Sequence, residues 1–391
     1  MQLVLGNRPF RLLWTARTVS FLGDSLSLVA LMLYVAGETG QALAVAALLL
    51  VGDFTPALLG PLTGALADRF ERRRVMVSCE LAQAVVMVVV ALWLPSLGPL
   101  LVLVGVRAIA GQIFQPASRA VVPGLVRDED LESANAAVGF GTNGGEALGP
   151  LVAAALLPFI GVRGVFLLDA ASFLLSAALL IFLPATPKED NESRGSLLTE
   201  TKAGLRYIAT TPLLRALGLG FFAVVACNGI DDVALVFLAK DTLHGGDSAV
   251  AILLAAVGIG LLAGYALLAR PYPRLSIPVL LIAGFAVSSA GNLLTGLVGA
   301  VAAAFAVQAV RGLGIAGMDV ATNTLVQRTV PADLLGRVFG TLYGAIGIAA
   351  ALSYLGGGIL LDLTGPRTAF LVAGIGGLAA TLGTALAIRR R

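Results

Sequence analysis

The stretch "GALADRFERRRV", residues 64–75, places two carboxylates and four arginines between two long apolar runs. Charged residues make up only 13% of this 391-residue chain, and hydrophobic residues make up 58%. An ordinary soluble domain is about 25% charged. The composition therefore indicates a membrane protein, in which residues 64–75 form a polar connection between two membrane-spanning helices.

Apolar runs continue in both directions from this connection. A spanning helix needs about 20 mostly apolar residues, and the chain contains twelve such runs. Aromatic residues amount to only 6% and no strand alternation is present, which argues against a membrane barrel. We therefore expect an all-α polytopic protein. The expected spans are 10–36, 42–66, 74–94, 100–122, 131–157, 164–184, 213–239, 246–268, 276–296, 299–322, 336–361 and 368–388.

The connections between these runs alternate in charge. Turns such as 37–41 and 95–99 carry no Lys or Arg, whereas the alternate connections, such as 69–74, are rich in them. Cytoplasmic loops of membrane proteins carry this excess of basic residues. We therefore expect residues 64–75 and both termini to be cytoplasmic, in a multi-pass protein of the cell (cytoplasmic) membrane, the cell inner membrane.

The longest polar stretch divides the chain near its middle. It predicts an N-terminal six-helix half at 1–184, a cytoplasmic linker at 185–212 and a C-terminal six-helix half at 213–391. Apolar residues at helical spacing from Ser196 onward predict a short amphipathic helix within the linker.

The two halves share a sequence pattern, which indicates a duplication. Parallel repeats of six helices with a site between them are the architecture of rocking secondary transporters. Arginines inside apolar runs carry most of the match. The residues Arg107, Val121, Val126 and Leu131 recur at a constant offset of 204 as Arg311, Leu325, Val330 and Leu335.

The opening stretch resembles the signature of the major facilitator superfamily, Gly-x-x-x-Asp-Arg-x-Gly-Arg-Arg. Glu71 stands where that pattern has its second glycine. The resemblance implies twelve transmembrane helices in two six-helix repeats. It also implies a cytoplasmic latch, in which the Asp lies near the N-terminal end of a helix in the other half, a position that favours a carboxylate. The residues that fit are Gly64, Asp68, Arg69, Arg72 and Arg73.

Two further stretches resemble the same superfamily. "RAIAG" at 107–111 resembles a motif of proton-coupled members, and "GGEALGPLVAA" at 144–154 resembles the antiporter signature through Gly149 and Pro150. Other stretches, such as "QPASRAVVPGLV" at 115–126, are similar to the drug and siderophore exporter subgroup that contains macrolide efflux proteins and the enterobactin exporter.

Six ionisable residues fall deep within the expected spans, where a charge is costly and usually faces the interior of the bundle. We predict that they line a substrate and proton-coupling cavity. For Asp24 the alternative is a structural hydrogen bond to a neighbouring helix. Of Asp231 and Asp232, one is expected to line the cavity, while the other pairs with a partner or lies at the outer interface. The partner of Arg107 is open among Asp24, Asp53 and Glu146. For Glu80, Asp169 and Asp319, closer to helix ends, we expect snorkelling or loop contacts. The six deep residues are Asp24, Asp53, Arg107, Glu146, Asp231 and Asp232.

These features predict a secondary active transporter that exports small amphipathic, drug-like molecules by proton antiport with alternating access. The alternative cargo is an endogenous siderophore or a lipid-like metabolite. We expect a monomer in the lipid bilayer, with no cofactor, metal or nucleic-acid partner. An enzyme is disfavoured because the single histidine, His244, lies in an expected outer loop and no Walker-type loop is present. A non-transporting receptor would carry a sizeable soluble domain, and no loop is long enough for one.

Overall fold

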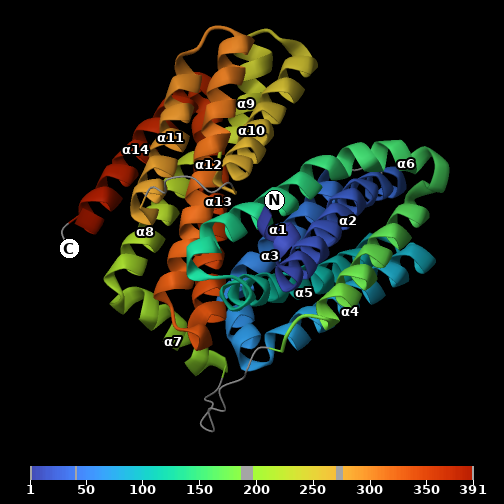
Figure 1. Ribbon diagram of the computed structural model, residues 1–391. Helices are drawn as coiled ribbons and strands as arrows, with labels where there is room; N and C mark the ends of the chain where they lie inside the picture. Colours follow the sequence, from blue (N-terminus) through green and yellow to red (C-terminus); the bar gives the residue numbers. More distant parts are fainter. Residues whose placement is uncertain (1, 40–41, 186–196, 270–275, 390–391) are drawn as a thin grey trace. The chain divides into compact units, whose positions relative to one another are not determined.

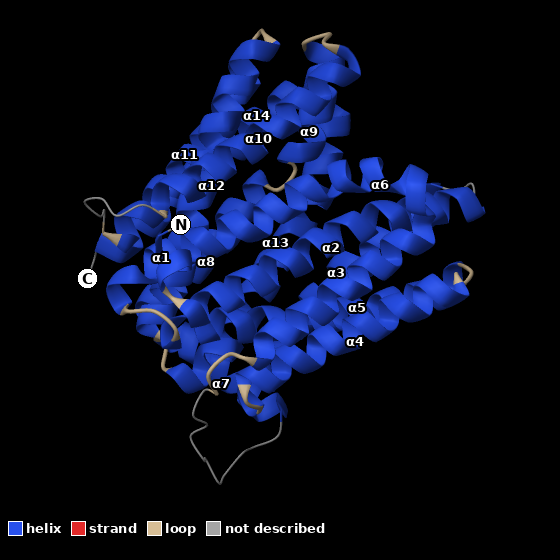
Figure 2. Cartoon of the chain, turned by 45° about the vertical axis from the view of Figure 1, so that its right-hand side comes forward, coloured by secondary structure: helices blue, strands red, loops and turns tan. Residues whose placement is uncertain are grey.

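The computed structural model describes residues 2–39, 42–185, 197–269 and 276–389, and these contain helices and connecting turns but no strand (Figure 2). The first seven helices are α1 Gln2–Gly6, α2 Arg8–Thr39, α3 Ala42–Arg69, α4 Arg72–Trp93, α5 Leu97–Val121, α6 Leu131–Ile181 and α7 Leu197–Thr210. The remaining seven are α8 Pro212–Asn228, α9 Asp231–Phe237, α10 Gly246–Leu268, α11 Ile277–Leu297, α12 Val301–Thr329, α13 Leu335–Thr364 and α14 Pro366–Arg389.

The helices agree with a protein that crosses a membrane many times. Among the described residues, nine helices are long and apolar enough to span a bilayer. The three other expected spans lie within α3, the first part of α6 and α10. The expected linker helix is also present as α7, while residues 186–196 of the linker lie outside the described residues. The all-helical membrane fold predicted from composition is confirmed.

Two of the expected spans, 131–157 and 164–184, follow one another through a sharp turn in α6. Gly161 at this turn has φ 62° and ψ −179°. That combination is essentially restricted to glycine, because a Cβ atom would clash with the backbone. The glycine therefore lets two spanning helices follow each other without an intervening loop.

One expected span is broken. The run 213–239 was predicted as a single helix, but α8 ends at Asn228 and α9 begins at Asp231. A break inside a membrane helix is tolerated where neighbouring helices satisfy the exposed backbone groups. It places the acidic side chain of Asp231 at the first residue of α9, inside the helical bundle, where it is 6% exposed.

The described chain folds into two compact units. The first comprises Met1–Arg206 with Thr329–Gly344, and the second comprises Tyr207–Arg328 with Ala345–Arg391. In the first unit α2 packs along α6, and α4 packs on α5 and α6 (Figure 1). In the second unit α14 packs against α8 and α11.

A row of glycines on α6 allows it to pack closely on α2. A Cβ atom on Gly145 would lie 3.1 Å from the backbone nitrogen of Leu22 and from the carbonyl oxygen of Thr18. One on Gly149 would lie 2.9 Å from the carbonyl carbon of Ser25. Small residues of this kind let helix backbones approach one another in a membrane. The pattern at 144–154 therefore serves the packing that supports the middle of α2.

We predict that Gly145→Val destabilises the protein by about 1–3 kcal/mol, because the side chain would be forced against the backbone of α2. Thermal unfolding of the purified protein in detergent measures this change. The matched control is Gly98→Val, since no atom lies within 4 Å of a Cβ at that glycine in α5. Equal melting temperatures for the two variants would contradict the packing argument.

Candidate functional site

Asp68, at the end of α3, caps the first turn of α13. Its Oδ1 accepts a hydrogen bond of 2.9 Å from the backbone N–H of Gly336, and its Oδ2 accepts one of 2.8 Å from that of Arg337. The carboxylate side chain is fully buried. The unpaired N–H groups and the dipole at a helix N-terminus favour a carboxylate at this position.

The arginines after Asp68 bind backbone carbonyls of neighbouring segments. Arg72 donates to the carbonyl of Ala120 at 2.9 Å and to that of Ala332, and its guanidinium lies 3.9 Å from Asp68. Arg73 donates to the carbonyl of Leu183 at 3.1 Å. Thus the loop after α3 contacts the ends of α5 and α6 and the turn before α13.

The remaining members of the opening stretch end α3. Arg69 is its last residue and is partly buried. Gly64 lies against α13, where an added Cβ atom would be 3.0 Å from the Cα of Arg337. Glycine at this position allows the two backbones to approach closely.

Glu71 replaces the glycine of the superfamily pattern without straining the turn. Its φ of −60° and ψ of 121° are accessible to any residue. The carboxylate forms ion pairs with Arg73 at 3.2 Å and with Arg74 at 2.9 Å. Glutamate at this position thus forms ion pairs with the arginines that follow it.

Inside the bundle, Arg107 on α5 lies between two carboxylates. It forms an ion pair with Asp24 of α2, and its guanidinium lies 3.9 Å from Asp169 of α6. The side chains of Asp24 and Arg107 are 31% and 13% exposed, and that of Asp169 is fully buried. Among the partners that the sequence left open for Arg107, the structure selects Asp24.

The expectation for Glu80 and Asp169 was wrong. Both side chains are fully buried rather than directed to a helix end. Ser20 donates a hydrogen bond of 3.2 Å to Glu80, and Ser172 donates one of 3.4 Å to Asp169. The prediction used only the distance of each residue from the helix end. The face of the helix on which a side chain lies determines whether it is buried. The signal that was available is the pair of Glu80 and Gln83, two polar residues one turn apart on an apolar helix.

The sequence analysis also did not identify Arg17 as a buried charged residue. Arg17 is 3% exposed. Its guanidinium donates to the hydroxyl of Ser118 and, at 3.2 Å, to the side-chain oxygen of Gln115. Helix α2 therefore contributes a buried cation, Arg17, and, two turns further along, the partly exposed acidic residue Asp24.

These groups surround a cavity of about 390 Å³ within the first unit, which we call the acidic cavity. Asp24, Glu80 and Arg107 line it together with three glutamines, and apolar side chains complete the wall. A cavity of this size with a few convergent polar groups is typical of a site for a small ligand. The glutamines are Gln83, Gln112 and Gln115.

For three of the predicted cavity residues, the structure describes the helix but not the side chain. Asp53 lies on α3, Glu146 on α6 and Asp232 on α9, but their side chains lie outside the described part of the structure. Pro150 lies within α6, next to Gly149, and is exposed.

The second unit contains a corresponding ion pair. Arg311 of α12 pairs with Asp231 of α9, and each side chain is 7% exposed. Gln308 accepts a hydrogen bond of 3.1 Å from Arg311 and donates one of 3.2 Å to Thr295. The two arginines that match at an offset of 204 thus each pair with an aspartate of the first expected span of their own half. These aspartates are Asp24 in the span 10–36 and Asp231 in the span 213–239.

Many membrane-spanning helices with buried charges around an internal cavity are typical of membrane transporters. The sequence matches the Major Facilitator Superfamily over residues 13–340. The chain belongs to this superfamily of transporters, and it is not an enzyme.

Relatives and solved structures agree with this assignment. The chain is 29% identical to the uncharacterized MFS-type transporter YfiS of Bacillus subtilis over 97% of its own length and 94% of the relative's. It is 29% identical to macrolide efflux protein A of Streptococcus pyogenes over 31% of each chain. A bacterial homologue of the iron transporter ferroportin, in an outward-facing state, superimposes with a TM-score of 0.81 at 17% identity, covering 98% of this chain and 100% of that one. The structural likeness shows the fold.

We predict that Arg311→Met destabilises the protein by about 3–5 kcal/mol, because Asp231 would be left as an uncompensated buried charge. Adding Asp231→Asn is expected to restore much of the lost stability, as measured by thermal unfolding in detergent. Arg215→Met, at an exposed arginine of α8, is the control. A double variant no more stable than Arg311→Met would show that the pair is not a unit.

Proposed function

We propose that this transporter exports small amphipathic, drug-like molecules from the cell in exchange for protons. The observation that carries the proposal is the grouping of three carboxyl groups, those of Asp24, Asp169 and Glu80, around the single guanidinium of Arg107. We place the protein in the cytoplasmic membrane with both termini inside. Access alternates through motion of the halves 1–184 and 213–391.

Charge balance explains why this cluster suits proton coupling. One guanidinium compensates one carboxylate, and a second buried carboxylate without a partner would cost several kcal/mol. We propose that one of these carboxyl groups carries the coupling proton while another pairs with Arg107. A cationic ligand entering the cavity would supply the missing positive charge and allow that proton to leave. Exchange of protons for cargo then follows from electrostatics.

The lining of the acidic cavity fits an amphipathic cargo. Glutamine side chains offer both donors and acceptors, and Phe21 and Leu28 provide apolar contacts on α2. We assign Asp53, Glu146 and Asp232 to the same pathway as further acidic positions. The similarity to macrolide efflux protein A supports export as the direction of transport.

The Asp68 contact is proposed to act as the cytoplasmic gate. A smaller cavity of about 210 Å³ adjoins the acidic cavity, since Gln112 and Gln115 line both. The first turns of α13 form its other wall, where Tyr343 lies under Arg119 with 3.6 Å between the guanidinium carbon and the ring centre. Releasing α13 from Asp68 would open this path.

Weakening the latch should expose the cavity to the cytoplasmic side. In a background with Cys79→Ala and Cys227→Ala, Gln112→Cys serves as a reporter for an impermeant maleimide added to inverted membrane vesicles. Asp68→Asn is expected to raise the labelling rate about fivefold, because it removes a carboxylate worth about 1 kcal/mol at a helix N-terminus. Asp128→Asn, in an exposed turn, is the control. An unchanged rate with Asp68→Asn argues against the gate.

Proton exchange can be measured with inverted vesicles that hold an acidic interior and a fluorescent pH probe. Adding ethidium or erythromycin is expected to release protons through the wild-type protein, and Asp24→Asn and Asp169→Asn should each reduce this release at least tenfold, in line with loss of a positioned proton carrier. Asp128→Asn should not change it. Release with a catecholate siderophore alone would identify the alternative cargo. Transport that persists after a protonophore abolishes the gradient would rule out proton antiport.

A further inference from the structure

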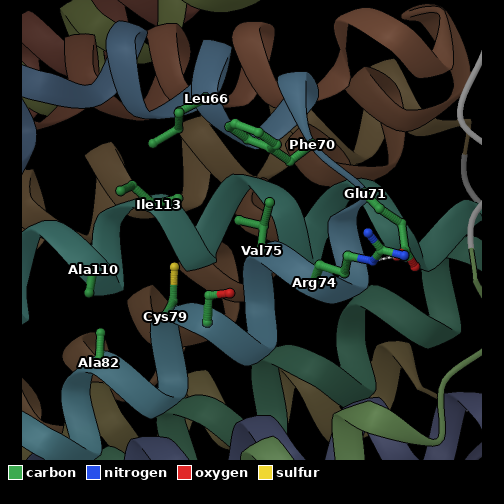
Figure 3. A pocket seen from close by; sticks show the side chains of 10 residues that line it. Leu66, Phe70, Glu71, Arg74, Val75, Cys79, Ala82, Ala110 and Ile113 are labelled. Carbon is green, nitrogen blue, oxygen red and sulfur yellow. Dashed lines mark ion pairs between the residues drawn. The ribbon is translucent and has the colours of Figure 1, made fainter. Parts of the chain in front are cut away.

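A third cavity, of about 630 Å³, lies in the first unit between α3 and α4 (Figure 3). We call it the α3–α4 groove. Its lining is apolar along most of its length, and its two charged residues, Glu71 and Arg74, lie together at one end (Figure 3). Leu66 comes from α3, Phe70 from the turn that follows it, Ser78 and Ala82 from α4, and Ile113 from α5.

The groove opens on the side of the protein that faces the bilayer. On α4, the exposed residues follow one helical stripe that begins at Arg74 and continues through Ser78 and Leu81 to Val85. Leu81 is 44% exposed and Val85 is 63% exposed, although α4 is apolar enough to cross a membrane. Such a stripe is in contact with acyl chains. Since Arg74, Ser78 and Ala82 also line the groove, the groove is a hollow in the lipid-facing surface.

The charged end of the groove carries a net positive charge. Glu71 pairs with both Arg73 and Arg74, so the three residues together have a charge of +1. The side chain of Arg74 is 81% exposed, and its Nε lies 2.9 Å from Glu71. An arginine oriented by one nitrogen while most of its side chain is exposed suits binding of a phosphate group.

The dimensions match one leaflet of a bilayer. From Arg74 to Ala82 the groove follows α4 for eight residues, or about 12 Å at 1.5 Å per residue. Half of the hydrocarbon core of a bilayer is about 15 Å thick. An acyl chain in the groove therefore places its head group at Arg74, and the cytoplasmic leaflet, where we place this end of α4, is rich in anionic lipids.

We propose that the α3–α4 groove binds a phospholipid with an anionic head group, whose phosphate contacts Arg74 and whose acyl chain lies between Phe70 and Ala82. The site is separate from the acidic cavity. Binding adds a ligand beside Glu71 and Arg73, in the same connection that carries Asp68, so lipid composition becomes a regulator of this end of α3.

The test is native mass spectrometry of the purified full-length protein with phosphatidylglycerol and with phosphatidylethanolamine of identical acyl chains. Phosphatidylglycerol is expected to bind about fivefold more tightly, since one arginine near an anionic head group contributes about that much. Arg74→Gln should remove this preference. Ala82→Phe, which fills the groove, should weaken binding of both lipids at least fivefold.

Two matched controls separate the groove from general lipid contact. Val85→Phe adds the same side chain one turn further along the stripe. Arg127→Gln removes an arginine that, like Arg74, is exposed and forms ion pairs; its side chain is 76% exposed. Both should bind lipid as the wild type does. Equal binding of the two lipids, an unchanged preference in Arg74→Gln, or equal losses in Val85→Phe would each overturn the proposal. This experiment measures lipid binding and not transport. A negative result would therefore leave the proposed exchange of protons for cargo unaffected.

Discussion

A guanidinium among apolar helices needs an acidic or polar partner, and each half of this transporter contains an arginine that pairs with an aspartate. An isolated charge in the middle of a bilayer costs several kcal/mol or more. Arg107 meets Asp24, and Arg311 meets Asp231. Each pair joins two helices that are distant in sequence, α2 with α5 and α9 with α12. These contacts determine which faces of the helices point inward, and the cavities and packing follow from that orientation.

The two pairs differ in their surroundings, although their arginines occupy matching positions in the sequence pattern of the two halves. Around Arg107 there are further acidic side chains and a cavity. Around Arg311 there is a network of amides and hydroxyls, in which Asn228 donates to Ser289 at 3.0 Å and accepts from Asn292 at 3.1 Å. Neutral groups that satisfy one another rigidify a core, whereas the surroundings of Arg107 contain further ionisable side chains beside a cavity.

Much of the fold was predictable because apolar runs of bilayer length leave few alternatives. The arginine pair was found through the repeat, since a buried cation is rare enough to be informative. The sequence did not reveal which carboxylate meets Arg107, nor that Glu80 and Asp169 are buried, because these depend on how α2, α4 and α6 pack. The break before Asp231 was also missed, although Asn228, Gly229 and the two aspartates at 231–232 interrupt the apolar run at this point.

Helix α13 has a mechanical consequence for any working cycle. It is continuous from Leu335 to Thr364, yet its first part, up to Gly344, belongs to one compact unit and the remainder belongs to the other. A rigid rod cannot follow two bodies that move apart. Either the contact between Asp68 and the first turn of α13 is released, or the helix bends near Gly344. Two glycines in the run "YGAIG" at 343–347 favour bending there. Any motion of the two units relative to each other must therefore be accommodated at the first turn of α13 or near Gly344.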